Sequence, residues 1–271
     1  MEIKFSKLSY TDKNKNSKLL DNISLDIKSG SIVSFLGENL DIIPNLLSII
    51  KRPSSGEIKI DKTIIRRTSH ITNISNIRKK LGLVFDDNEY YEETIKDEIK
   101  STMKNNGCKI TSVIKHIVDS LKLVGLDDSY LDRRIDSLST SEKKKFNLAL
   151  VLSYNPDVII LNNFFQGMYY RDIEYFKKLF KKLKSKFKKT IIVLTRDLKD
   201  TIDLVDKIYV INNGVLVLNG GQELYYSTKL YKYCEMPKIV EFTKYAQEQG
   251  HNILEYTDLK ELIKELYRKV S

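Results

Sequence analysis

The sequence has no tryptophan, only four prolines and only two cysteines. Cys108 and Cys234 lie far apart and outside any CxxC or Cys/His cluster, which argues against a disulfide scaffold and against a zinc site. Isolated thiols of this kind are typical of a reducing cytoplasm. The three histidines, His70, His116 and His251, stand in unrelated contexts, which favours ordinary surface or core roles.

Long apolar runs are also missing. No stretch approaches the ~18 consecutive apolar residues of a membrane-spanning helix, and the start, MEIKFSKLSY, lacks the apolar core of a secretory signal. We therefore expect a soluble or membrane-peripheral protein. The 271 residues, 41% of them hydrophobic, suffice for one large α/β domain or two small ones.

The charge balance is basic, with a formal net charge of +10 at pH 7. Such an excess favours anionic partners such as membrane surfaces or nucleic acid. However, lysine, asparagine and isoleucine are abundant along the whole chain, which favours a general composition bias, and we consider a nucleic-acid partner the weaker interpretation.

The first sixty residues predict strands around one short helix. Apolar alternation or buried-strand patterns cover residues 3–5, 20–27, 31–36 and 57–60, the last resembling an edge strand. A polar run at 12–18 predicts a hairpin turn, residues 45–51 predict a short helix, and 53–56 predict a turn. Tyr10 falls at a structural position in the strand alternation.

A second buried strand is predicted in the middle of the chain. Residues 158–161 are apolar, the preceding Pro156 and Asp157 mark a turn, and Asn162 and Asn163 follow directly. Residues 88–150 predict mainly helix, with breaks near 105–107 and 125–128.

Six segments then follow one another in a recognisable order. They are LLDNISLDIKSGSIVSFLGEN, RPSSGEIKID, RKKLGLVFDDNEYY, the run from LKLVGLDDSYL to VIILNN, TIIVLTRD and DLVDKIYVINNGVLVLNG. In this order and spacing they resemble the ATP-binding subunit of ABC transporters. The resemblance implies an α/β, P-loop NTPase-like core with an antiparallel β subdomain, a helical subdomain over about residues 88–150, and ATP with Mg²⁺ as cofactors.

The C-terminal segment narrows the resemblance. GGQELYYSTKLYKYCEMPKIVEFTKYAQEQG, followed by DLKELIKEL, is similar to the C-terminal extension of the ATPase subunits of energy-coupling factor (ECF) transporters, which serve prokaryotes. We expect residues 1–222 to form the ABC ATPase-like domain and 223–271 a C-terminal helical extension. Within the extension we expect helices over 224–250 and 258–269, with Thr257 as the N-cap of the last.

A lysine-rich helix is predicted over residues 171–189. Its apolar stripe comprises Ile173, Phe176, Phe180, Leu183 and Phe187, and its opposite face is almost pure lysine. The two interpretations are a core helix with a solvated face, which we favour, and a surface for anionic lipid or nucleic acid.

The resemblance places a phosphate loop at residues 37–45, but the residue types depart from the family pattern. The positions are Gly37, Asn39, Leu40, Asp41, Ile42, Ile43, Pro44 and Asn45. Ile43 replaces the phosphate-binding lysine and Pro44 the magnesium-binding hydroxyl, while Leu40 and Ile42 replace glycines. Pro44 remains a good residue for the first turn of a helix. We expect the loop to keep its structural role and to lose its phosphate-binding role.

Other catalytic positions depart in the same direction. Asn162 and Asn163 stand where the family carries the magnesium-binding acid and the glutamate that polarises water, and an amide has neither charge nor basicity. Asp86 stands at the Q-loop glutamine. Arg196 stands at the switch histidine, and arginine cannot shuttle a proton. We expect no intact catalytic residue and no metal site formed by this chain alone.

The signature loop is the best-preserved motif. Its residues are Leu138, Ser139, Thr140, Ser141 and Glu142. In the family this loop caps the partner subunit's ATP, so the retained serine implies a contact with a partner's phosphate. The spacing Ser-x-x-Glu is also a capping-box pattern, which a purely structural role explains equally well.

Three hypotheses follow. The first is a non-hydrolysing ABC-type subunit of an ECF-like transporter, a pseudoenzyme in a heterodimer with a second ABC ATPase subunit. It would dock on a transmembrane subunit at the cytoplasmic face of the cell membrane. The second is a divergent active ATPase that uses Glu38 or Asp41. The third is a basic scaffold that binds lipid or nucleic acid through residues 171–189.

Overall fold

The computed structural model describes residues 1–12, 17–85, 88–109, 111–251, 253–254 and 259–270. Its strands are β1 (Ile3–Asp12), β2 (Ser17–Ile27), β3 (Ile32–Gly37), β4 (Ser55–Ile60), β5 (Thr63–Ile65), β6 (Leu81–Val84), β7 (Val158–Asn162), β8 (Thr190–Thr195), β9 (Lys207–Asn212) and β10 (Val215–Gly220). Its α-helices are α1 (Ile42–Leu47), α2 (Ile74–Lys79), α3 (Ile95–Asn105), α4 (Val113–Leu123), α5 (Thr140–Ser153), α6 (Tyr170–Phe187), α7 (Lys238–Glu248) and α8 (Leu259–Val270). Single 3₁₀ turns are η1 (Asp128–Tyr130), η2 (Ile135–Ser137), η3 (Gln222–Tyr226) and η4 (Leu230–Lys232).

The strands form two sheets. The first is antiparallel, in the order β2-β1-β4-β5, and the second has the order β10-β9-β3-β8-β7-β6. In the second sheet β9, β3, β8, β7 and β6 run parallel, and β10 returns antiparallel to β9. The predicted antiparallel β subdomain is thus present. The expectation of an edge-like strand at 57–60 is wrong, because β4 pairs with β1 on one side and with β5 on the other.

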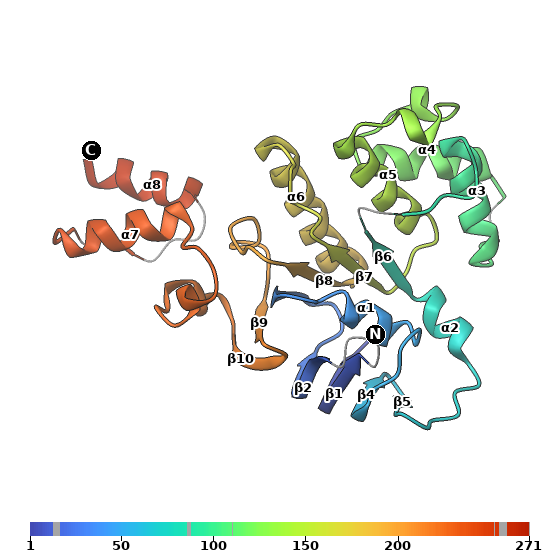
Figure 1. Cartoon of the computed structure of the whole chain (residues 1–271). Coiled ribbons are helices and arrows are strands. Elements are labelled where there is room, and N and C mark those ends of the chain that lie inside the picture. The colour runs from blue at the N-terminus through green and yellow to red at the C-terminus, as the bar shows by residue number, and fades with distance from the viewer. Residues whose placement is uncertain (13–16, 86–87, 110, 252, 255–258, 271) are drawn as a thin grey trace.

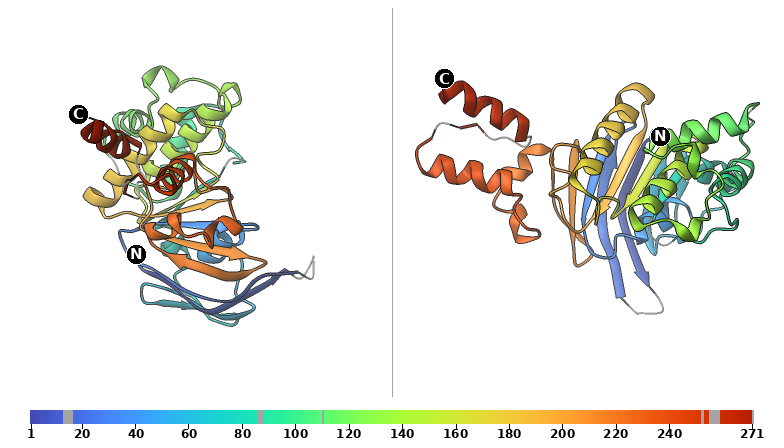
Figure 2. Two further views of the ribbon diagram at one scale, coloured as in Figure 1. Left: turned by 90° about the vertical axis from the view of Figure 1, so that its left-hand side faces the viewer. Right: turned by 90° about the horizontal axis from the view of Figure 1, so that it is seen from above.

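The six-stranded sheet is covered on both faces (Figures 1 and 2). Side chains alternate along each strand, so Val33 and Phe35 of β3 face the antiparallel sheet and α1, while Ile32 and Leu36 face α5 and α6. Two buried apolar clusters result, one on each face. This layering leaves the ends of the parallel strands as the place where loops can gather.

A helical unit lies at one end of the sheet (Figure 1, right). Helices α3, α4 and α5 pack against one another through Ile99, Ile117, Leu121 and Phe146, each at most 1% exposed. The described residues between 88 and 153 contain these three helices and the turns η1 and η2. The prediction of a mainly helical segment at 88–150 is therefore confirmed.

Helix α6 buries most of the stripe that its sequence predicted. Phe176 and Phe180 pack with Phe164, which follows β7, in edge-on contacts with ring centroids 5.0 and 5.6 Å from that of Phe164. Phe187 is different, since it ends the helix and is 58% exposed. The lysine face is also less uniform than expected, because Lys177 is buried and forms an ion pair with Asp203 at 2.6 Å.

The C-terminal helices α7 and α8 lie beside the sheets (Figure 2, right), and Val240 of α7 belongs to the main buried cluster. They share a small apolar cluster of Ala246, Ile253 and Leu262. Thr257, the expected N-cap of the last helix, lies outside the described residues. Among the described helices, none combines the length and the apolar character needed to cross a bilayer.

A pair of substitutions tests which face of α6 is structural. Phe176→Ala removes a fully buried ring from the aromatic cluster and is expected to lower the free energy of unfolding by about 3–5 kcal/mol. Lys178→Ala on the outer face is expected to change it by less than about 0.5 kcal/mol. Urea denaturation of both variants measures the difference. Equal effects of the two changes would contradict this packing.

Candidate functional site

The parallel strands bring the predicted motif residues to one edge of the sheet. β3 pairs with β8 and β9, and β8 pairs with β7, so Gly37, Asn162 and Thr195 end neighbouring strands on the same side. Arg196 follows Thr195 directly. In open α/β sheets, ligands bind outside this carboxyl edge. The structure therefore assembles the phosphate-loop, asparagine and arginine positions around one region.

Gly37 begins the phosphate-loop segment, and only glycine suits its position. Its φ is +152°, and a Cβ there would lie 2.2 Å from the carbonyl oxygen of Ile211 on β9. The next residue with positive φ is Asn39, at +54°, a region that asparagine tolerates. Leu40, which replaces a family glycine, does not adopt a positive φ and is only 6% exposed.

Helix α1 begins at Ile42, three residues before the predicted start at 45. All of its side chains except that of Asn45 are apolar and buried. Ile43, in the position of the phosphate-binding lysine, is 0% exposed and belongs to the apolar cluster between the two sheets. The backbone N–H groups of Ile42 and Ile43 donate to the carbonyls of Asn39 and Leu40 at 3.4 and 2.9 Å. Pro44 has no N–H. These donors are thus engaged within the loop.

Asn162 ends β7, and Asn163 follows it directly. Asn163 has φ of +47°, and its N–H donates to the carbonyl of Leu194 on β8 at 2.9 Å. Asparagine adopts this left-handed conformation more readily than most residues. Both side chains line a cavity of about 190 Å³ together with Asp41 and Arg196. The Asn162 and Asn163 amides provide no negative charge for a divalent cation.

These residues do not fit Mg²⁺ and ATP held in the manner of the family. A lysine ammonium, a magnesium-binding hydroxyl and two carboxylates are replaced by a buried isoleucine, a proline and two amides. Asp41 is an acid within the loop, but its side chain is exposed and forms no capping hydrogen bond with α1. Asp86, predicted at the Q-loop position, lies outside the described residues.

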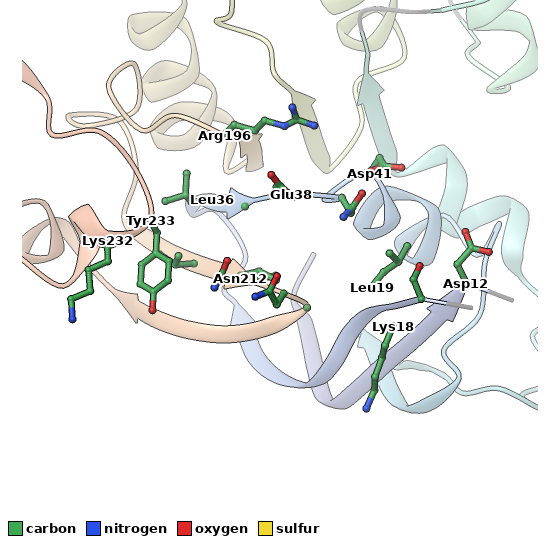
Figure 3. Close-up of a pocket in the computed structure, with 17 residues that line it drawn as sticks. Asp12, Lys18, Leu19, Leu36, Glu38, Asp41, Arg196, Asn212, Lys232 and Tyr233 are labelled. Atoms are coloured by element: carbon green, nitrogen blue, oxygen red, sulfur yellow. The ribbon is translucent and has the colours of Figure 1, made fainter. Parts of the chain in front are cut away.

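A larger cavity of about 770 Å³ extends from this edge toward the C-terminal segment (Figure 3). Glu38, Asp41 and Arg196 line one part of it. Lys232, the last residue of the 3₁₀ turn η4, and Tyr233, which follows it, line another. Sequence reasoning missed Lys232 and Tyr233, because they come from the extension and no local motif marks them. Tyr10, expected at a structural position, is buried in the apolar cluster between the sheets.

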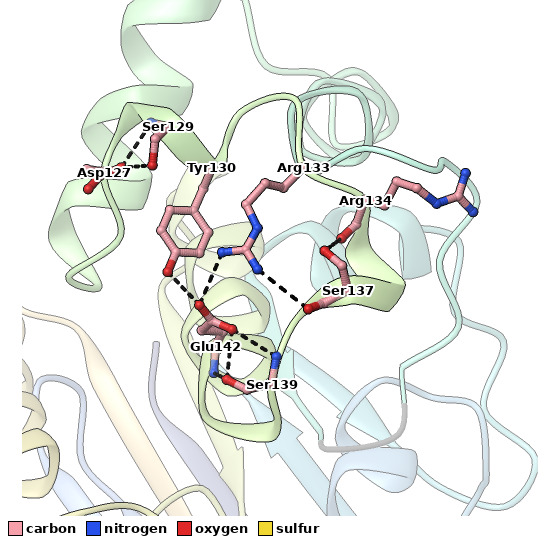
Figure 4. Close-up of polar contacts among 8 residues, drawn as sticks. All are labelled: Asp127, Ser129, Tyr130, Arg133, Arg134, Ser137, Ser139 and Glu142. Carbon is pink, nitrogen blue, oxygen red and sulfur yellow. Dashed lines mark hydrogen bonds and ion pairs between the residues drawn. The ribbon is translucent and has the colours of Figure 1, made fainter.

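The signature loop forms a complete capping box at the start of α5 (Figure 4). The Ser139 hydroxyl accepts from the N–H of Glu142 at 3.3 Å, and Glu142 Oε2 accepts from the N–H and the hydroxyl of Ser139 at 2.8 Å each. Leu138 is buried, whereas Ser139 and Thr140 are exposed. The structural role expected of Ser139 is present, and its predicted contact with a partner's phosphate stays a prediction.

Two residues upstream complete this cap. The Tyr130 hydroxyl donates to Glu142 Oε1, and Arg133 Nη1 donates to the same oxygen at 3.2 Å while its guanidinium lies 4.5 Å from the centroid of the Tyr130 ring. The Tyr130 hydrogen bond, followed by those from Ser139, lowers the pKa of Glu142 to about 2. Glu142 is therefore ionised, and its carboxylate links Tyr130, Arg133 and Ser139 through hydrogen bonds.

A further residue that sequence reasoning missed is Lys144. It is 4% exposed, and its ammonium donates to the carbonyls of Asn163, Phe164 and Gln166 at 3.0, 3.3 and 2.8 Å. These carbonyls form the turn after the paired asparagines. Lys144 thus ties the signature helix to that turn. The lysine triplet at 143–145 does not reveal this link, because nothing in the sequence distinguishes Lys144 from its two neighbours.

Comparison with known proteins agrees with this arrangement. The family model described as ABC transporter matches residues 20–165, over half of the sequence. The chain belongs to the ABC transporter family. It is 30% identical to the energy-coupling factor transporter ATP-binding protein EcfA2 of Streptococcus thermophilus, over 93% of this chain and 94% of that protein. The EcfA2 of Clostridium acetobutylicum is 29% identical over 93% and 92% of the two chains. Within the family, the chain therefore groups with the ATP-binding proteins of ECF transporters.

Solved structures show the same fold. The cbiO1 protein of Clostridium perfringens, part of the ABC transporter complex cbiONQ, superposes with a TM-score of 0.71 at 23% identity, over 89% of this chain and 98% of that one. The ATP-binding cassette MJ0796, in a dimeric form bound to ADP and Pi, gives 0.72 at 20% identity, over 81% and 98%. The predicted fold class is confirmed.

Protonation of Glu142 tests the signature-loop network. Because the folded-state pKa of about 2 lies below the ordinary value of 4.5, the carboxylate contributes stability that is present above pH 4.5 and is lost as the pH falls toward 2. Removing the phenol hydroxyl in Tyr130→Phe is expected to raise the pKa of Glu142 in a side-chain NMR titration. Tyr175→Phe, whose hydroxyl bonds Leu123 instead, is the control. An unchanged pKa in Tyr130→Phe would rule out the network.

The Lys144 link is tested by Lys144→Met, which keeps the chain length and removes the ammonium. The carbonyls that it binds lose a donor, so the free energy of unfolding is expected to fall by at least about 1–3 kcal/mol. Amide hydrogen exchange is expected to accelerate within residues 163–168. Lys143→Met, at a partly exposed position, is the matched control. Similar exchange in both variants would show that Lys144 does not hold the turn.

Proposed function

We propose that this chain is the non-hydrolysing ATP-binding-cassette subunit of an ECF-like transporter. In this proposal it pairs with a second ABC ATPase subunit whose motifs are intact, and the pair docks on a transmembrane subunit at the cytoplasmic face of the membrane. Residues 1–222 would form the cassette and residues 223–271 the helical extension. Its kinship with ECF ATP-binding proteins supports the transporter role.

The observation that carries the proposal is the burial of Ile43. A phosphate-binding lysine must reach into the cavity, but this side chain is packed at 0% exposure between the sheets. No described side chain of α1 offers a cation in its place. Without that charge, the loop lacks the main electrostatic contact to the terminal phosphates of a nucleotide.

The paired asparagines support the same conclusion for the chemical step. Hydrolysis needs a carboxylate to orient and polarise the attacking water, and a second acid in the metal's shell. The amides of Asn162 and Asn163 supply neither. Arg196 stays protonated and cannot accept a proton at the switch position.

The signature loop supports a role toward a partner subunit. Ser139 is exposed at the start of α5, and the helix N-terminus there carries a partial positive charge. The Ser139 hydroxyl donates to Glu142 Oε2 at 2.8 Å, so it must turn away from this carboxylate to donate to a phosphate oxygen. We infer that this loop faces the nucleotide of the intact subunit, so that one of the two composite sites of the heterodimer remains active.

The remaining hypotheses are weaker. A divergent ATPase would depend on Glu38 or Asp41, both of which line the large cavity, but it would still lack a lysine in the loop. A basic scaffold would depend on α6, where Lys177 and Lys181 are engaged by Asp203 and Lys184 by Asp206. These ion pairs reduce the charge available for a polyanion.

The assembled complex tests the proposal. The full chain is purified together with a transmembrane subunit and an ATPase subunit with intact motifs, and ATP turnover is measured. Asn163→Ala is expected to leave turnover within about twofold, since this site performs no chemistry. Ser139→Ala is expected to lower turnover by about tenfold or more, because it removes a contact to transferred phosphate. Replacement of the intact subunit's catalytic glutamate is expected to abolish turnover.

Two results would overturn the proposal. One is turnover by this chain alone that Glu38→Gln, Asp41→Asn or a change at Asn163 abolishes, which would establish the divergent ATPase. The other is the absence of any ATPase or membrane partner in the purified complex, together with salt-dependent binding to polyanions that Lys178→Ala and Lys182→Ala weaken.

A further inference from the structure

A further cavity, of about 560 Å³, lies beyond the C-terminal end of α1. Its walls come from the end of β1, the segment between α1 and β4, and the loop that follows β5. The phosphate-loop segment precedes α1, whereas this cavity adjoins the residues that follow it. Asp12 alone among the lining residues is shared with the 770 Å³ cavity. The two cavities are therefore distinct.

Three cations line this cavity. Lys51 and Arg67 are exposed, and neither has an ion pair or a side-chain hydrogen bond in the part of the chain that the structure describes. Arg52 donates through Nη1 to the carbonyl of Ser69 at 2.5 Å, which uses one of the five N–H groups of its guanidinium. Asp12 is the one acid on the described walls. Because like charges in one cavity repel one another, a bound anion is stabilised here.

The backbone after α1 fixes the position of Lys51. Ile49 has φ of +59°, a conformation that is unusual for a β-branched residue. The N–H groups of Ile50 and Lys51 both donate to the carbonyl of Asn45, at 2.9 and 3.0 Å. This reversal leaves the Ile50 side chain 58% exposed at the cavity, where it offers an apolar contact beside the cations.

A second segment holds Arg67. The N–H of Arg66 donates to Ser69 Oγ at 2.8 Å, and the N–H of Ser69 donates to the carbonyl of Arg66 at 3.3 Å, which closes a turn around Arg67. Because Arg52 binds the carbonyl of Ser69, this turn is tied to the segment after α1. The cations of both segments are thus held around one cavity.

Two hydroxyl groups add neutral donors. Ser54 Oγ accepts from the N–H of Thr11 at 2.9 Å, so the hydroxyl hydrogen of Ser54 is not used in that bond. The N–H of Ser54 donates to the carbonyl of Ser9 at 2.8 Å, which fixes this residue against β1. Thr11 and Ser54 are both partly exposed and line the cavity. Guanidinium, ammonium and hydroxyl donors together suit the oxygens of an oxyanion.

The volume and the number of cations indicate more than one anionic group. At about 560 Å³ the cavity lies within the roughly 300–1,000 Å³ of small-molecule sites. A single phosphate or carboxylate would leave most of this space to water. An anion with several charged groups can reach the lysine and both arginines at once, and each arginine can bind two oxygens side by side.

We propose that this cavity binds a small oxyanion with two or more anionic groups. One group contacts the guanidinium groups of Arg52 and Arg67, another contacts Lys51, and the hydroxyls of Thr11 and Ser54 donate to remaining oxygens. Condensed phosphates and small polycarboxylates share this chemistry. The site goes beyond the proposed function, since it uses neither the phosphate loop nor the signature loop.

Calorimetric titration of tripolyphosphate into the full chain tests the proposal. A chelator is present and the ionic strength is held constant, because screening weakens exposed charges. Tripolyphosphate is expected to bind at least about tenfold more tightly than inorganic phosphate, since it meets several cations. Arg67→Ala is expected to weaken binding by about tenfold, because charge-assisted hydrogen bonds are lost. Lys51→Ala is expected to weaken it severalfold.

Two control variants separate this cavity from general attraction to a basic protein. Arg171→Ala removes another exposed arginine, on α6, and Arg196→Ala removes the arginine at the carboxyl edge. Both are expected to leave tripolyphosphate binding within about twofold. In the unmodified chain, ligand-induced shifts of amide NMR signals are expected at Thr11 and Ser54. Because the side chains of Lys51 and Arg67 are exposed, their replacement leaves the apolar core intact.

Citrate, titrated under the same conditions, distinguishes the two ligand classes. Binding as tight as that of tripolyphosphate identifies a site for multivalent oxyanions in general, and weaker binding identifies condensed phosphate as the ligand. The proposal is overturned if tripolyphosphate shows no saturable binding, if inorganic phosphate binds equally well, or if Arg67→Ala weakens binding no more than Arg171→Ala or Arg196→Ala. These results leave the proposed function standing.

Discussion

Parallel pairing within the six-stranded sheet is the constraint on which the rest of the structure depends. Because β3, β7, β8 and β9 run in one direction, their carboxyl ends lie at one edge. Residues that are more than a hundred positions apart, such as Gly37 and Asn162, thereby meet around one region. The antiparallel sheet on one face and α5 and α6 on the other hold this edge in place.

At that edge, the backbone keeps the arrangement of the family, whereas the side chains at the catalytic positions differ from those of the family. Gly37 keeps the close approach of the loop to β9, and the cap of α5 is intact. Ile43, in contrast, contributes to the core instead of to the cavity, and Arg196 is an exposed cation at the end of β8. A positive charge thus lies at the end of β8, beside Asn162 and Asn163 and near Asp41, and not in the phosphate loop. The scaffold survives such changes because its stability depends on buried apolar contacts, which the substitutions at the edge leave in place.

The fold was largely predictable from sequence. Strand alternation and the Gly37 turn are local patterns, and the order of the motifs along the chain resembles that of the ABC transporter family. The start of α1 was misplaced, although Asp41 is a residue type that favours the N-cap. The interior position of β4 depends on its pairing with β5, the short strand that directly follows it. Phe187 fits the helical stripe but ends its helix, so tertiary structure does not cover it. At the site, residue types indicated what was lost. The link through Lys144 and the cavity wall from Tyr233 depend on contacts across long sequence separations, which no local pattern encodes.

The central claim is that this chain no longer holds a magnesium–nucleotide complex through its phosphate loop. The most direct measurement is calorimetric titration of ATP with excess Mg²⁺ into the purified full chain. If the loop no longer holds the complex, no saturable binding is expected below about millimolar concentration, and added Mg²⁺ does not strengthen binding. Micromolar binding that strengthens with Mg²⁺ and is lost in Asn162→Ala would contradict it.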